Sequence, residues 1–163
     1  MKGKVCLVTG ANAGIGKATA WMLARMGATV VMIARNRERG QPVLDQVRDK
    51  SGSSDVFLLS ADFSSLAQVR KLAADFKASF DRLDVLINNA ATIPLQRQVT
   101  VDGFEMQWQV NHLAPFLLTN LLLDLLKASA PSRVVNVSST VHSSGKIDFE
   151  DLNAEREYRS SWK

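Results

Sequence analysis

The chain has 163 residues, of which 46% are hydrophobic and 22% are charged, and its formal net charge is +4. This length suits one domain with a sizeable core, and the composition excludes an intrinsically disordered chain. The basic residues are spread along the sequence without a long run, which argues against a nucleic-acid partner.

Short apolar runs alternate with helical patterns along the whole chain. The strands are predicted, in chain order, at Val5–Val8, Thr29–Ile33, Val56–Leu59, Val85–Ile87 and Val134–Val137. The helices between them are predicted from about Ile15 to Met26, Asn36 to Lys50, Ser65 to Phe80 and Asp102 to Lys127. The 3.6-residue spacing of the first helix predicts that its large apolar side chains, including Ile15, Met22 and Met26, face the core.

Alternation of helices with short, fully apolar strands is typical of a parallel sheet that helices cover on both faces. Right-handed crossovers then give the α/β fold class, with a doubly wound, Rossmann-type sheet of five parallel strands. Residues 1–163 form one domain, without a repeat or a linker. The sixth strand usual in such sheets is missing from the polar stretch 143–163, so we expect the fold to be incomplete at its C-terminus.

A glycine-rich turn, Thr9-Gly10-Ala11-Asn12-Ala13-Gly14-Ile15-Gly16, joins the first strand to the first helix. Gly10 permits a sharp turn, while Gly14 and Gly16 let the backbone approach a pyrophosphate and let the helix pack closely on the strand. The N–H groups and the positive dipole end of the helix attract an anion. The turn therefore predicts a phosphate-binding site; the alternative is one turn glycine and two packing glycines.

Arg35 follows the second strand in a small basic cluster with Arg37 and Arg39, which favours a local anionic ligand. NAD-binding folds carry Asp or Glu at this place, about 20 positions after the glycine turn, to bind the adenosine ribose. An arginine there suits the 2′-phosphate of NADP instead. NADP(H) is thus the preferred cofactor and NAD(H) the alternative, unless Arg35 is only a surface residue before a helix cap.

Polar residues also follow the third and fourth strands. Asp62 is expected to accept a hydrogen bond from the adenine amino group, with a helix-capping role as the alternative. Asn89 and Ala90 belong to Asn88-Asn89-Ala90-Ala91, at the carboxyl edge where ligands bind in open α/β sheets. The alternative for this run is an ordinary turn.

Two further polar residues are candidates for catalysis. Asn111 is an amide in an otherwise apolar helical stretch, so either a structural network or an active-site water should hold it. Ser139 ends the fifth strand, where its hydroxyl could bind a substrate carbonyl, although such a serine often only caps a helix. Neither His112 nor His142 has a partner at ligand spacing, so no metal site is predicted.

Cellular location is inferred from three features. The single cysteine, Cys6, cannot form an internal disulfide, and the strand at Val5 leaves no room for the apolar core of a signal peptide. The longest apolar stretch, 113–126, is too short and too polar to span a bilayer. We therefore expect a soluble, cytoplasmic protein.

Together these residues resemble the short-chain dehydrogenase/reductase family. The shared marks are T-G-x-x-x-G-I-G from Thr9 to Gly16, Asp62, N-N-A-x from Asn88 to Ala91, Asn111, and the strand end from Val135 to Ser139. The runs V-N-H-L-x-P-F-L-L-T-N-L-L-L and R-V-V-N-V-S-S are similar to the branch of retinol dehydrogenases and WW-domain oxidoreductases.

The resemblance implies the strand order 3-2-1-4-5 and the cofactor-binding portion of an NADP-dependent carbonyl reductase or alcohol dehydrogenase. It implies a small-molecule carbonyl or alcohol as substrate and a homo-oligomer in the complete protein. Asn111 would hold a water and Ser139 would polarise the carbonyl, and Ala91 replaces the usual glycine of the family. The implied cofactor contacts are Thr9, Gly10, Asn12, Gly14, Ile15, Gly16, Arg35, Asp62, Asn89 and Ala90.

The proton donor of the family is the tyrosine of a Y-x-x-x-K motif. The single tyrosine of this chain, Tyr158, is followed by a lysine, Lys163, at the fifth position instead of the fourth, which lies off the shared helix face. The stretch from Asp148 to Lys163 resembles the segment before that motif, so we expect the chain to be truncated before its general acid and to be inactive alone. The alternative is a non-catalytic module of a shortened isoform that binds a nucleotide or a partner.

Overall fold

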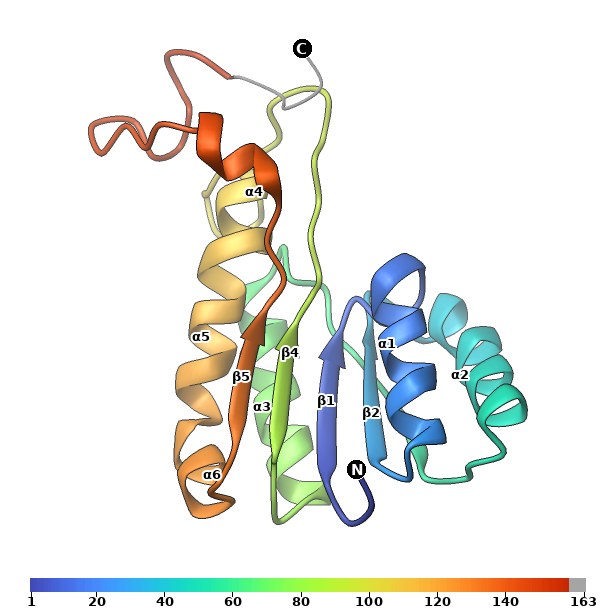
Figure 1. The fold of residues 1–163 in the computed structure, drawn as a ribbon. Helices are drawn as coiled ribbons and strands as arrows, with labels where there is room; N and C mark the ends of the chain where they lie inside the picture. Colours follow the sequence, from blue (N-terminus) through green and yellow to red (C-terminus); the bar gives the residue numbers. More distant parts are fainter. Residues whose placement is uncertain (159–163) are drawn as a thin grey trace.

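The computed structural model of the chain describes residues 1–158 and contains a five-stranded sheet (Figure 1). Its strands are β1 (Val5–Thr9), β2 (Thr29–Ala34), β3 (Val56–Ser60), β4 (Val85–Asn88) and β5 (Arg133–Asn136). Every neighbouring pair is parallel, and the order is β3-β2-β1-β4-β5. The predicted fold class and strand order are confirmed.

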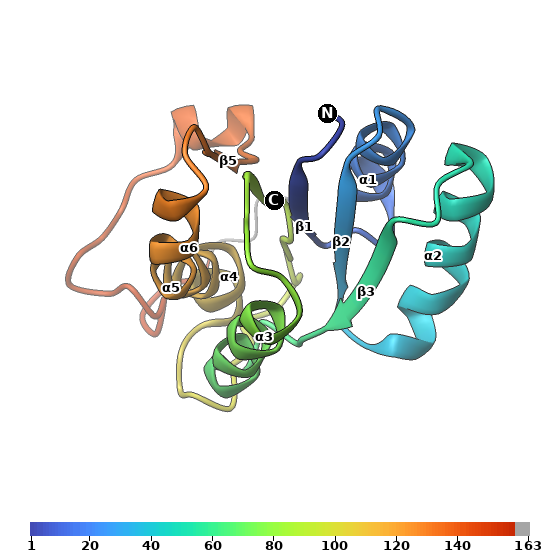
Figure 2. The ribbon, with the colours of Figure 1, turned by 90° about the horizontal axis from the view of Figure 1, so that it is seen from below.

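Helices cover both faces of the sheet (Figure 2). One face carries α1 (Gly14–Arg25) and α2 (Arg37–Ser51), and the other carries α3 (Leu66–Ser79), α5 (Ala114–Leu121) and α6 (Leu123–Ala128). Successive residues of a strand therefore enter different cores: Leu7 packs with the second group of helices, whereas Cys6 and Val8 pack with the first. This two-sided burial is the reason that the strands are continuously apolar.

The packing of α1 differs from the predicted one. Ile15, Met22 and Met26 are 66%, 45% and 54% exposed, and the buried residues of the helix are instead Gly16, Ala20 and Ala24. The prediction was wrong because apolar spacing favours large side chains, whereas α1 lies so close to the sheet that only small ones fit beneath it.

The long helical region predicted from Asp102 to Lys127 begins later and is interrupted. Gly103 has a φ of +85° in a turn that is closed by a 2.8 Å hydrogen bond from Thr100 N to Phe104 O. The helix consequently starts with α4 (Met106–Trp108), and a π-helical turn, η1 (Gln109–Leu113), precedes α5. Such π turns occur frequently at functional sites, and this one contains Asn111.

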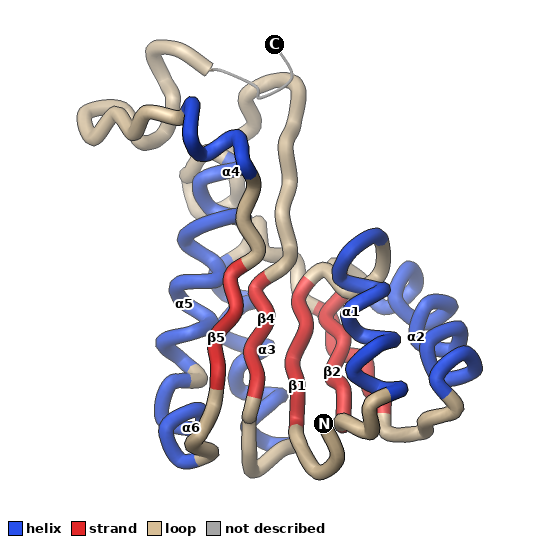
Figure 3. The backbone as a smooth tube through the Cα atoms, viewed as in Figure 1, coloured by secondary structure: helices blue, strands red, loops and turns tan. Residues whose placement is uncertain are grey.

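The loops after β4 and β5 extend far beyond the carboxyl ends of the strands (Figure 3). The second of these loops contains a short 3-10 helix, η2 (Thr140–Ser144). The glycine turn after β1 lies at the same edge of the sheet (Figure 1). Most of the predicted site residues line two pockets at this edge. Within residues 1–158, no helix is long and apolar enough to cross a membrane.

Candidate cofactor and active site

The glycine turn is pressed against the segment after β4. Gly10 has a φ of +64°, and a Cβ there would lie 2.8 Å from Ala90 Cα. A Cβ on Gly16 would lie 2.4 Å from both Asn89 Nδ2 and Gly10 O. Gly14, with a φ of +50°, opens α1 and has open space around it. A side chain at Gly10 or Gly16 would therefore clash with its neighbours, whereas Gly14 is required because its positive φ would strain any other residue.

Thr9 and Asn89 fasten the end of β1 to the end of β4. Thr9 Oγ1 accepts hydrogen bonds from the backbone N–H groups of Asn89 and Ala90, each at 2.9 Å. Asn89 Nδ2 donates to Thr9 O at 2.8 Å and to Gly10 O at 3.3 Å. These two side chains hold the shape of the glycine turn.

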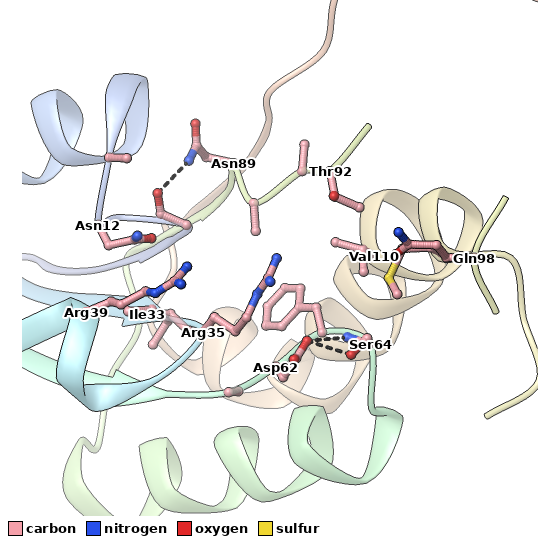
Figure 4. A pocket seen from close by; sticks show the side chains of 18 residues that line it. Asn12, Ile33, Arg35, Arg39, Asp62, Ser64, Asn89, Thr92, Gln98 and Val110 are labelled. Atoms are coloured by element: carbon pink, nitrogen blue, oxygen red, sulfur yellow. Dashed lines mark hydrogen bonds between the residues drawn. The ribbon is translucent and has the colours of Figure 1, made fainter. Parts of the chain in front are cut away.

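A pocket of about 490 Å³ lies at this edge, between the glycine turn and the ends of β2 and β3 (Figure 4). The predicted cofactor residues that line it are Gly10, Asn12, Arg35, Asp62, Asn89 and Ala90. The others lie outside the lining: Thr9 and Gly16 are buried behind it, Gly14 begins α1, and Ile15 is exposed on the first turn of α1.

Two guanidinium groups, those of Arg35 and Arg39, line the pocket (Figure 4). Arg39 lies in the first turn of α2, where its backbone N donates to the capping Oδ1 of Asn36 at 3.0 Å. Within residues 1–158, neither guanidinium forms an ion pair. From the sequence, Arg39 was recognisable only as part of a basic cluster. Its position in the first turn of the helix that follows Arg35 is the signal that could have identified it.

Asp62 lines the same pocket from the loop between β3 and α3. Its Oδ1 accepts from Ser64 N at 2.9 Å and from Ser64 Oγ at 2.8 Å. The cap of α3 is Ser65, whose Oγ accepts from Gln68 N at 3.4 Å. Asp62 thus orders its own loop and does not cap the helix.

A second cleft, of about 830 Å³, shares Asn89, Ala90 and Ala91 with the first. Asn111 and Ser139 both line it, so the fold brings the two candidate catalytic residues together. Ser139 Oγ accepts from Val141 N at 3.4 Å and caps η2, as in the alternative interpretation of this residue.

Asn111 is exposed rather than buried, contrary to the expectation from its apolar surroundings. Its Oδ1 accepts from Thr92 N at 2.8 Å and its Nδ2 donates to Thr92 O at 2.9 Å. Its apolar neighbours in the sequence are no guide to its burial: within η1 the buried residues are Gln109 and Val110, whereas the Asn111 amide bonds to Thr92 in the loop after β4.

Tyr158 lies next to this cleft but does not line it. Its hydroxyl donates to Pro94 O at 2.6 Å and accepts from Gln107 Nε2 at 2.8 Å. Burial, and then the charge of Glu105, raise the pKa of Tyr158 despite the bond from Gln107. A tyrosine in this setting is a poor proton donor near neutral pH; Lys163, its unsuitable partner, lies outside the described residues.

The sequence pattern described as short chain dehydrogenase matches residues 4–150. The chain belongs to the short-chain dehydrogenase family. The expected resemblance is thereby confirmed, and relatives place the chain in the retinol dehydrogenase-like branch of these oxidoreductases. It is 48% identical to human retinol dehydrogenase 13 and 46% identical to human retinol dehydrogenase 14, over 93% and 99% of its length. These alignments cover 46% and 52% of the two relatives, so the chain spans about half the length of these curated proteins.

Solved structures share the fold. A crystal structure of an uncharacterised protein from Mycobacterium paratuberculosis superposes with a TM-score of 0.83 at 39% identity, over 99% of this chain and 55% of that one. The active-site complex of Pseudomonas aeruginosa RhlG with NADP has a TM-score of 0.77 at 34% identity, over 91% of this chain and 59% of that one.

Proposed function

We propose that this short-chain dehydrogenase chain binds NADP(H) in preference to NAD(H), as the cofactor-binding portion of an enzyme that interconverts a carbonyl and an alcohol. The observation that carries the proposal is the pair Arg35 and Arg39, two guanidinium groups without ion-pair partners within residues 1–158, in the pocket formed by the glycine turn. Two unpaired cations at one site favour an anionic group, and a 2′-phosphate distinguishes NADP from NAD.

The residues of the pocket fit such a cofactor. Gly10 and Gly16 leave a cradle that side chains would fill, and the N-terminus of α1 adds N–H donors for a pyrophosphate. Asp62 uses Oδ1 within its loop, which leaves Oδ2 to accept from an adenine amino group. The NADP complex of RhlG, a protein of the same fold, supports this assignment by analogy.

The second cleft supplies groups for the reaction. A bound nicotinamide would donate or accept the hydride. Ser139 Oγ can donate a hydrogen bond to a substrate oxygen, and Asn111 keeps one amide hydrogen and one oxygen lone pair beyond its bonds to Thr92, enough to hold a water. Ile93, Phe116 and Val137 line the same cleft and favour an apolar carbonyl or alcohol as substrate.

Calorimetric titration with NADP⁺ and NAD⁺ tests the cofactor assignment. Arg35→Ala and Arg39→Ala should each weaken NADP⁺ binding about tenfold or more, because a hydrogen bond to a charged group contributes about 1.5–3 kcal/mol. Binding of NAD⁺ should change little, and Arg35→Asp should erase or reverse the preference. Arg70→Ala, which removes an exposed arginine of α3, is the control with the same loss of charge.

Two results would contradict the proposal in different ways. Equal dissociation constants for NADP⁺ and NAD⁺ in the unmodified chain would refute the NADP preference. No binding of either dinucleotide would refute the cofactor site itself.

A further inference from the structure

One buried side chain, that of Gln109, connects the wall of the cofactor pocket to the π turn that carries Asn111. Gln109 is 0% exposed. Its Nε2 donates to Phe63 O at 3.1 Å and to Asp102 Oδ2 at 2.8 Å, and its Oε1 accepts from Thr100 Oγ1 at 2.6 Å. Both hydrogens of the amide and one lone pair of its oxygen are thus in use.

These hydrogen bonds hold the loop between β3 and α3 at two points. The first is the carbonyl of Phe63, which Gln109 bonds directly. The second is the backbone N of Leu66, which donates to the same Asp102 Oδ2 at 2.8 Å. Phe63 itself and Ser64, which follows it, line the cofactor pocket next to Asp62. The position of this wall therefore depends on the amide of Gln109.

Sequence neighbours of Gln109 also line the same pocket. Met106 and Val110 line the pocket, and Val110 is buried in the core that contains Phe63. The side-chain bonds of Gln109 reach residues 63, 100 and 102 but neither Thr92 nor Ser139 of the second cleft. The geometry thus connects Gln109 more closely to the adenosine end of the site than to the reacting end.

We infer that Gln109 is a positioning residue for adenine recognition: it fixes the wall that carries Asp62 so that this carboxylate can accept from the adenine amino group. The inference rests on the proposed dinucleotide site. An apolar side chain could fill the same volume, but it would leave the Phe63 carbonyl and the Thr100 hydroxyl without their partner. The wall would then shift, and recognition of the adenine amino group would weaken.

The test compares two ligands that differ at the adenine amino group. NADP⁺ carries the amino group, whereas nicotinamide hypoxanthine dinucleotide phosphate carries an oxo group in its place. Calorimetry on the unmodified chain should show tighter binding of NADP⁺. Gln109→Met, a change of similar length without amide groups, should weaken the binding of NADP⁺ about tenfold or more, because the bond at risk is one to a charged carboxylate. The binding of the hypoxanthine analogue should weaken no more than about twofold.

Ser129→Ala is the matched control. Ser129 is also buried, at 7% exposure, and its hydroxyl also joins two segments: it accepts from Leu83 N at 2.9 Å and donates to Leu125 O at 2.7 Å. It lies at the opposite end of the sheet from the cofactor pocket. This variant should be less stable to urea, yet it should keep the preference of the unmodified chain for NADP⁺.

Asp102→Ala keeps the inference testable if Gln109→Met does not fold, because Asp102 is exposed. Like Gln109→Met, this variant should reduce the preference for NADP⁺ over the hypoxanthine analogue, here by about twofold to fivefold. Three results would overturn the role of Gln109. The variants could weaken the binding of both ligands equally, they could leave the preference for NADP⁺ unchanged, or the unmodified chain could bind both ligands equally well. Failure of the unmodified chain to bind either ligand would instead overturn the dinucleotide site, and the role of Gln109 with it.

Discussion

At the scale of single residues, Gly16 matters because it lies in close contact with the glycine turn and with Asn89. Gly16→Ala should gain about 1 kcal/mol of helix propensity, but its Cβ would lie 2.4 Å from Gly10 O and Asn89 Nδ2. Overpacking of this kind costs about 1–3 kcal/mol, so we expect a net loss in the free energy of unfolding. Binding of NADP⁺ should weaken too, because the displaced turn forms the pocket. Urea denaturation and calorimetry measure the two effects.

Ala18→Gly is the control for this substitution, because Ala18 lies on the exposed side of the same helix. It should lose about 1 kcal/mol through helix propensity alone and leave NADP⁺ binding unchanged. If Gly16→Ala stabilised the protein, the close contact between α1 and the glycine turn would not exist in solution.

Asp84 joins secondary-structure elements at the amino-terminal edge of the sheet. It is 1% exposed and precedes β4, and its carboxylate accepts from Val5 N at 2.8 Å and from Lys4 Nζ at 2.9 Å. Arg82 donates to both carboxylate oxygens, at 2.7 and 2.9 Å. Burial alone would raise the pKa of Asp84, but the bonds from Arg82, Val5 and Lys4 outweigh it and hold the pKa well below its usual range.

A lowered pKa in the folded state makes stability depend on pH in a defined direction. The carboxylate stabilises the fold above the pKa of an unfolded aspartate, about 3.9, and this contribution is lost as the pH falls below that value toward the folded-state pKa. Asp84→Asn should cost about 2–4 kcal/mol at pH 7 and should flatten the decline of stability on acidification below about pH 5. Urea denaturation at several pH values measures both.

The control for Asp84 is Asp75→Asn. Asp75 pairs with Lys71 on the surface of α3, where the two side chains are 42% and 73% exposed. Such exposed pairs contribute only about 0–1 kcal/mol, so this variant should follow the pH profile of the unmodified protein. If the stability of Asp84→Asn also followed the pH profile of the unmodified protein, the buried carboxylate would not connect β1 to β4.

At the scale of the whole molecule, we expect residues 1–163 by themselves to show no detectable turnover. The sequence contains no Y-x-x-x-K motif, and the hydroxyl of Tyr158 is bonded to Pro94 and Gln107 with a raised pKa. General acid–base catalysis contributes about 10²–10⁴-fold, which this chain would lack. An assay of NADPH oxidation with a panel of ketones and aldehydes, beside a full-length short-chain dehydrogenase, measures this. Activity that disappears in Tyr158→Phe would identify Tyr158 as the proton donor.

The sequence by itself determined the class of fold and much of the cofactor pocket. Strands buried on both faces must be apolar at every position, so their runs are visible without any tertiary information. The carboxyl ends of parallel strands meet at one edge, which is why Arg35 and Asp62 could be placed at one site from their positions after strands. The glycine turn was recognisable because its strand, its turn and its helix are adjacent in the chain.

Only the tertiary structure decided how elements distant in sequence contact one another. Periodicity detects large apolar residues, so it could not show that α1 turns Gly16, Ala20 and Ala24 toward the sheet. Nor could it show that Asn111 is exposed, or that the side chain of Gln109 reaches Phe63, because such contacts depend on the packing of separate segments. Local propensity and strand order follow from neighbouring residues, whereas the partners of a buried polar group are fixed only when the chain closes around it.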